Sequence, residues 1–343
     1  MIDLVEILSY NRRHGSSGET TFIGKLLTAL HKFKELNPHV EIEADSIGNI
    51  WVTTAPKDVA PYLFVAHIDT CHKGDARPTF ILQHDNKIRL TTPDAGCLGA
   101  DDGVGLFINL SMIEAGTKGT FLFTRGEEAG LIGADWIVEY TPEKLEDFSF
   151  SIEIDREGTD EIIIEQMTGK CASKEFGEEL AKKLDMKHEI SYHGVYTDNS
   201  VFNEFIPENV NISAGYMFQH SVKEELDVAY VMSLLMRMKE VDWSTLPISR
   251  STKDFGERYD QWGYPANNSR YTQNLPRNYF EDYEMGRWNG HFDTSDEMDM
   301  KPMSKSIAEE YVEEEALKVA YYLYVNGVSP AEIEEAWLFG KGI

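Results

Sequence analysis

Short apolar runs alternate with segments of helical periodicity through the first 243 residues, and this alternation constrains the fold more than any other feature. Runs typical of buried strands lie at 62–69, 119–124, 148–155 and 209–216. Segments with apolar residues at helical spacing lie at 17–36, 105–116, 131–140, 174–185 and 225–241. Strands that alternate with helices form mostly parallel sheets. We therefore predict an α/β fold, a three-layer sandwich with a mostly parallel, mixed sheet and helices on both faces.

Two other stretches predict β-hairpins, at 40–54, where Gly48 and Asn49 supply the turn, and at 79–92. The pattern weakens after Trp243. We predict one core domain over 1–243, an irregular segment rich in polar and aromatic residues over 244–303, and a C-terminal extension over 304–343. Within that extension, helices are expected at 304–325 and 329–339.

Histidine and acidic residues gather at or just past the predicted strand ends and at the start of the helix near residue 105. They are His67, Asp69, Asp101, Asp102, Glu127, Glu128, Asp155 and His220. The carboxyl ends of parallel strands share one edge, where ligands bind, so these side chains are expected to converge. Each alone has an ordinary explanation, since an Asp-Asp-Gly run is usually a turn and Glu is favoured where helices begin. The ordered set favours a site.

The chemistry of this set points to metal ions. Two imidazoles and three or more carboxylates suit Zn²⁺, and also Co²⁺ or Mn²⁺. One carboxylate shared by two ions would place them roughly 3.5–4 Å apart. Consecutive side chains point in different directions, so one of Glu127 and Glu128 can bind an ion while the other faces the attacking water. Asp69, two residues after His67, is expected to hold the far ring nitrogen of that histidine.

Charge and cysteine content limit the partners and the compartment. A net charge of -27 repels phosphate backbones and anionic lipids, so neither nucleic acid nor membrane is an expected partner. Three unpatterned cysteines, Cys71, Cys97 and Cys171, argue against a disulfide framework and suit a reducing compartment. The sequence has no recognisable signal peptide and no apolar run of transmembrane length. We expect a cytoplasmic protein.

The order His-x-Asp, Asp, Glu-Glu, Asp, His resembles the co-catalytic zinc exopeptidases of clan MH. That group includes compact zinc aminopeptidases, glutamyl aminopeptidases, tripeptidase T and glutamate carboxypeptidases, which share a zinc-peptidase, phosphorylase/hydrolase-like fold. Flanking segments are similar as well: SSGET at 16–20, DSIGNIWV at 45–52, GVYTDNSVF at 194–202 and AGYMFQHSVKEELDV at 214–228. The resemblance covers roughly residues 15–243.

The resemblance implies a role for each matching residue. It implies two Zn²⁺ ions per chain, one held by His67, Asp101 and Asp155 and the other by Asp101, Glu128 and His220. Glu127 would be the general base that takes a proton from a water between the ions and delivers it to the leaving amine. Asp69 would orient His67. The resemblance also implies a cis peptide between Asp101 and Asp102.

The spacing of these residues differs from that of relatives with a lid. Only 65 positions separate Asp155 from His220, and 34 separate His67 from Asp101. Neither interval holds an inserted lid or dimerisation domain, so residues 1–243 resemble a lidless metallopeptidase catalytic domain. The region beyond is expected to pack on the core or to contact another copy in a homo-oligomer. A second His-x-Asp motif, at His291 and Asp293, is expected to be a loop.

We therefore expect a metallo-exopeptidase, foremost an aminopeptidase that removes N-terminal residues of short peptides. Two enzyme alternatives share the same metal chemistry, an amidohydrolase or deacylase and a carboxypeptidase. A carboxypeptidase needs a cationic anchor, and Arg125 is a candidate, although a solvent-facing arginine is the more ordinary interpretation. A third alternative is a non-catalytic binding or assembly module of the same fold. The complete ligand set and Glu127 argue against it.

Overall fold

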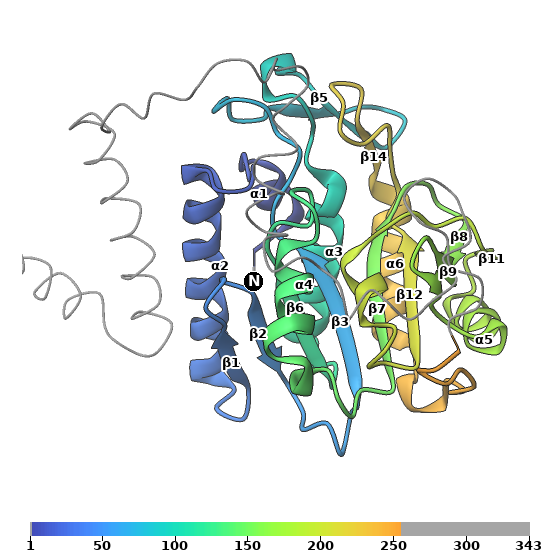
Figure 1. The fold of residues 1–343 in the computed structure, drawn as a ribbon. Coiled ribbons are helices and arrows are strands. Elements are labelled where there is room, and N and C mark those ends of the chain that lie inside the picture. Colours follow the sequence, from blue (N-terminus) through green and yellow to red (C-terminus); the bar gives the residue numbers. More distant parts are fainter. Residues whose placement is uncertain (1, 255–343) are drawn as a thin grey trace, which may run out of the picture.

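An eight-stranded mixed sheet lies at the centre of the computed structural model, which describes residues 2–254 (Figure 1). The strands, in spatial order, are β1 (Glu41–Ala44), β2 (Ile50–Thr53), β6 (Thr120–Thr124), β3 (Tyr62–His67), β7 (Phe150–Arg156), β12 (Glu208–Ser213), β8 (Glu161–Ile163) and β11 (Glu189–Ser191). The central strands β6, β3, β7 and β12 run parallel to one another. The hairpin of β1 and β2 extends one side in antiparallel fashion, and β8 pairs antiparallel with β12 on the other.

Helices cover both faces of this sheet, because alternate side chains of a strand point to opposite faces. The helices are α1 (Leu4–Leu8), α2 (Ser17–Leu36), α3 (Ala100–Glu114), α4 (Ile132–Tyr140), α5 (Lys174–Leu184) and α6 (Val228–Glu240). On β3, Phe64 and Ala66 join the larger core, to which α1, α2, α3, α5 and α6 contribute. Leu63 and Val65 join a smaller core with α4 and the short helix η3 (Asp198–Phe202). The predicted three-layer α/β architecture is confirmed.

A second, smaller sheet joins two distant parts of the chain. Its order is β13 (Tyr216–Met217), β14 (Glu225–Asp227), β5 (Lys87–Leu90) and β4 (Phe80–Leu82). β5 and β14 lie side by side near the top of Figure 1. Glu225 on β14 forms ion pairs with Lys87 and Arg89 on β5, the latter at 2.7 Å. The hairpin predicted at 79–92 is therefore present, and it is attached to the segment that carries His220.

The remaining described elements are short. They are β9 (Glu165–Gln166), β10 (Gly169–Lys170), η1 (Pro93–Ala95), η2 (Pro142–Lys144) and η4 (Trp243–Thr245). Several predicted boundaries differ from the structure: the helix expected at 105–116, for example, spans Ala100–Glu114. The helix expected from residue 225 begins at Val228, because residues 225–227 pair with β5 and Asp227 caps the helix by accepting a hydrogen bond from the Tyr230 amide.

The described chain continues beyond the predicted boundary at 243. Trp243 and Leu246 are buried, and the buried Arg250 guanidinium donates hydrogen bonds to the carbonyls of Asn203 and Ile206. Residues 244–254 therefore pack on the core. The divisions at 243 and 303 stay predictions. The helices expected at 304–325 and 329–339, the His291–Asp293 motif and the predicted oligomer contact lie outside the described residues.

None of the helices between residues 2 and 254 combines the length and the apolar character needed to cross a lipid bilayer.

Candidate metal centre

Asp101 lies between the two histidines singled out in the sequence. Its Oδ1 is 3.0 Å from Nε2 of His67, and its Oδ2 is 2.8 Å from Nε2 of His220. His67 ends β3, Asp101 lies in the first turn of α3, and His220 lies in the loop between β13 and β14. The peptide bond between Asp101 and Asp102 is cis, as predicted. One carboxylate thus faces two imidazoles from opposite sides, which is the arrangement that a shared ligand requires.

Asp155 completes a group around His67. Its Oδ1 is 3.6 Å from Nε2 of His67, and one ligand atom each from His67, Asp101 and Asp155 lie within 4.8 Å of one another. Asp155 is the penultimate residue of β7. Its carboxylate accepts hydrogen bonds from the Thr197 hydroxyl at 2.9 Å and from the Tyr216 hydroxyl at 2.8 Å. Burial, reinforced by the charge of Asp101, raises the pKa of Asp155 to about 6.

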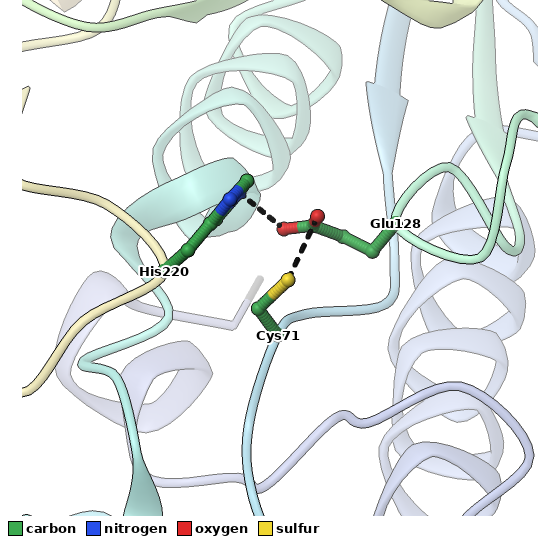
Figure 2. A group of neighbouring side chains, drawn as sticks. All are labelled: Cys71, Glu128 and His220. Carbon is green, nitrogen blue, oxygen red and sulfur yellow. Dashed lines mark hydrogen bonds and ion pairs between the residues drawn. The ribbon is translucent and has the colours of Figure 1, made fainter. Parts of the chain in front are cut away.

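Glu128 and His220 form a second group, together with a residue that the sequence analysis did not select. Oε1 of Glu128 is 3.0 Å from Nε2 of His220. The thiol of Cys71 donates to the other oxygen of the same carboxylate, at 2.9 Å (Figure 2). Ligand atoms of Cys71, Glu128 and His220 lie within 4.8 Å of one another. The side chain of His220 is 48% exposed, so the centre is open to solvent on this side.

Asp69 contacts His67 differently from the prediction, because its main-chain oxygen and not its carboxylate lies within hydrogen-bond distance of the ring. Its carboxylate accepts hydrogen bonds from the amides of Gly126, Glu127 and Glu128, at 2.7, 3.1 and 3.2 Å. The far ring nitrogen of His67 lies 3.0 Å from the main-chain oxygen of Asp69 and 3.8 Å from its carboxylate. A fully buried carboxylate needs hydrogen-bond donors, and these three amides supply them, so the carboxylate holds the turn of the glutamate pair. The main-chain oxygen of Asp69 orients His67.

Two buried charged residues that sequence reasoning missed fix the loop before Asp101. The carboxylate of Glu224 accepts hydrogen bonds from four consecutive amides, those of residues 98–101. The guanidinium of Arg12 donates to the carbonyls of Gly99, at 3.0 Å, and of Ile68, at 2.8 Å, so it joins this loop to the segment after His67. Both roles depend on contacts between distant positions, which local patterns do not indicate.

The crowding of acidic groups shows that these residues fit a cation. Burial raises the pKa of Glu127 well above its usual range, and the charges of Asp155, Asp198 and Glu128 add to the effect while His67 opposes it. Burial alone would lower the pKa of His67, but contacts with Asp101 and Asp155 raise it well above its usual value. Carboxylates this close cannot all ionise without nearby positive charge, which divalent ions supply. The nitrogen and oxygen donors suit zinc.

Arg125, considered from the sequence as a substrate anchor or as a solvent-facing residue, is partly buried and paired with Glu19. Its guanidinium donates to both carboxylate oxygens of Glu19, at 2.9 and 2.8 Å, and to the carbonyl of Ile47 at 3.0 Å. Glu19 also accepts a hydrogen bond from the Gly15 amide at 2.8 Å, and its own amide donates to the Ser16 hydroxyl. The ion pair therefore ties the capped start of α2 to Arg125, which lies two residues before Glu127.

Glu19→Gln is expected to lower the free energy of unfolding at neutral pH by about 3 kcal/mol. Burial alone would raise the pKa of Glu19, but His14 and Arg125 overcome it and lower the pKa from 4.5 to about 2. A lowered pKa stabilises the fold above the unfolded value, and that stability is lost as the pH falls from about 5 to about 2. Urea unfolding across this range measures the effect. As the pH falls, the free energy of unfolding of the variant should decrease less steeply than that of the wild type. An unchanged pH dependence would contradict the prediction. So would an equal loss of stability in the control Glu143→Gln, which changes an exposed glutamate.

The fold and this donor set define a class, the metal-dependent exopeptidases with an α/β sandwich. Within it, the chain belongs to peptidase family M28, whose model matches residues 49–259. Members of this family are typically zinc-dependent, and the chain is a metallo-exopeptidase and a hydrolase. The resemblance to clan MH zinc exopeptidases is thereby confirmed.

Solved structures share the fold at low sequence identity. A tripeptidase from Staphylococcus aureus matches with a TM-score of 0.55 and 17% identity, over 69% of this chain and 95% of that one. The aminopeptidase PepT from Bacillus cereus matches with a TM-score of 0.52 and 16% identity, over 69% of this chain and 95% of its own. A search of curated proteins finds no significant match.

Proposed function

We propose that the protein is a dinuclear zinc aminopeptidase that removes N-terminal residues from short peptides. The observation that carries the proposal is the position of Asp101, whose two oxygens face His67 at 3.0 Å and His220 at 2.8 Å. Asp155 lies beside the first imidazole and Glu128 beside the second. In this proposal His67, Asp101 and Asp155 hold one ion, and Asp101, Glu128 and His220 hold the other.

When bound, the zinc ions polarise the scissile carbonyl and make water a stronger nucleophile at neutral pH. Glu127 accepts the proton of the attacking water and delivers it to the leaving amine. Its position supports this role, because a carboxylate oxygen of Glu127 lies within 4.8 Å of ligand atoms of His67 and Glu128. Asp69 holds the main chain of the glutamate pair, so the base and the ligand beside it stay in fixed relation.

The charges around the centre favour a substrate with a free amine. The acidic groups of the centre attract an ammonium group and repel a free carboxylate. Arg125, which lies two residues before Glu127, is paired with Glu19 and is therefore less suited to bind the free carboxylate of a carboxypeptidase substrate. As part of the same proposal we place the protein in the cytoplasm, since Cys71, Cys97 and Cys171 are all free thiols.

The proposal is tested with zinc-loaded protein on paired substrates. A panel of aminoacyl p-nitroanilides is compared with the same compounds acetylated on the amine, and with N-acylated dipeptides. We expect cleavage of the free-amine compounds to exceed that of the blocked ones by at least about 100-fold in kcat/KM, because a site built for the amine leaves buried polar groups unpaired without it. Release of the acyl group would indicate a deacylase, and release of a C-terminal residue a carboxypeptidase. Zinc-loaded protein with no activity would indicate a binding module.

A further inference from the structure

We propose that Cys71 supplies a thiolate ligand to the ion held by Glu128 and His220. This inference rests on the proposed metal centre and deepens it, because it changes the second ion's donor set from nitrogen and oxygen to sulfur, nitrogen and oxygen. Figure 2 shows the three side chains pointing toward one another from separate segments of the chain. Cys71 follows β3, Glu128 follows β6, and His220 lies in the loop before β14.

The distances suit coordination at one centre. Sγ of Cys71 is 2.9 Å from one oxygen of Glu128, and the other oxygen is 3.0 Å from Nε2 of His220. Tetrahedral zinc, with bonds of about 2.0–2.3 Å, separates its ligand atoms by roughly 3.3–3.6 Å. The atoms of this group already lie within 4.8 Å of one another, so small rotations of the side chains would open the space for an ion.

The backbone on both sides of Cys71 is fixed, which makes the position of its thiol reproducible. The amide of Thr70 donates to the carbonyl of Arg12 at 3.1 Å, and the amide of Lys73 donates to that of Ala95 at 2.9 Å. Thr70 and His72 are both buried, with 2% exposure each, whereas Cys71 is partly exposed and faces Glu128.

The other cysteines have different surroundings. The thiol of Cys171 donates to the carbonyl of Gly169 and contacts Asn203, inside the fold. Cys97 is buried at 2% exposure. Of the three cysteines, all within residues 2–254, only Cys71 lies in a group of side chains that could hold a metal ion.

A sulfur ligand has chemical consequences. As the sulfur–metal bond forms, the thiol proton leaves to solvent, so binding of this ion releases a proton. Thiolate is a soft ligand and favours zinc over manganese or magnesium, which prefer oxygen. The site is therefore expected to discriminate between metals more strongly than a set of imidazole and carboxylates alone.

Cobalt spectroscopy tests the assignment without reference to activity. The full-length protein is stripped of metal and titrated with Co²⁺, a spectroscopic substitute for zinc. We expect an intense sulfur-to-cobalt charge-transfer band in the near ultraviolet that grows with one of the two ions bound. Cys71→Ser and Cys71→Ala should lose the band, keep the weaker visible bands of cobalt, and bind the affected ion at least about 10-fold more weakly. Cys97→Ala, the matched control, should keep the band.

The outcomes separate this inference from the proposed function. If the wild-type protein binds two Co²⁺ ions with no charge-transfer band, or if the Cys71 variants keep it, the thiol is not a ligand and the remaining centre stands. If the wild-type protein binds no cobalt and no zinc, the metal centre itself is wrong, and the inference with it. A wild-type spectrum without the band would overturn the inference alone, so the inference stays falsifiable even if the variants do not fold.

Discussion

Glu127→Gln is expected to lower kcat by about a thousandfold while the protein keeps its zinc. General-base catalysis typically contributes a factor of about 10² to 10⁴, and glutamine cannot accept the proton of the attacking water. The change is nearly isosteric, and the main chain at this position is held by the Asp69 carboxylate, so the geometry of the turn should persist. Initial rates on the best p-nitroanilide and metal analysis by mass spectrometry provide the two readouts.

The control for this variant is Glu143→Gln, an exposed glutamate in η2 that belongs to none of the metal-ligand groups found among the described residues. It should retain wild-type rates. If Glu127→Gln lost zinc together with activity, Glu127 would be a ligand and not the base. If it kept full activity with full zinc, another group would have to move the proton and the proposed role would be wrong.

Asp101→Ala is expected to lose both ions, whereas Asp155→Ala should lose one. The difference follows from geometry, since Asp101 faces His67 and His220, while Asp155 approaches His67 alone. Zinc at about 1,000 times its Kd stabilises a protein by about 4 kcal/mol per site. We expect zinc to stabilise the wild-type protein by this amount at each of the two sites, and to stabilise Asp101→Ala at neither. Calorimetric titration with zinc, together with thermal unfolding with and without zinc, measures it.

The comparison between the two variants makes this prediction specific. A protein that merely misfolds without Asp101 would lose the cooperative unfolding transition in metal-free buffer, which is checked first. If Asp101→Ala folded and still bound two ions with wild-type affinity, the shared-carboxylate arrangement would be wrong. If Asp155→Ala lost both ions as readily as Asp101→Ala, the assignment of Asp155 to one ion would fail.

The central fold was predictable from sequence because its strands are buried on both faces. Such strands are continuous apolar runs, and the pattern at β3 and β6 was sufficient to place them in a covered parallel sheet. Elements at the edges were harder to place. Residues 225–227 looked like the first turn of α6, yet they form β14, because the hairpin at 79–92 offers an unpaired edge that local periodicity does not encode.

The candidate site was predictable in so far as its residues lie at strand ends. His67 and Asp155 lie in the last residues of β3 and β7, and Glu128 lies shortly after β6. The supporting contacts did not follow, because they join residues far apart in sequence. Glu224 accepts hydrogen bonds from amides more than 120 positions earlier, and Cys71 meets Glu128 across 57 positions. Neither contact leaves a local signature.

The small sheet that joins β5 to β14 bears on when this protein becomes active. The segment that carries His220 continues into β14, whose Glu225 pairs with Arg89 on β5 at a separation of 136 positions. A chain emerging from the ribosome up to residue 219 would contain the base and the other proposed ligands but lack the histidine that closes the centre. Because the pairing of β14 with β5 closes a long-range loop, whose formation carries an entropic cost, we expect the proposed centre to be completed only after these two strands have paired.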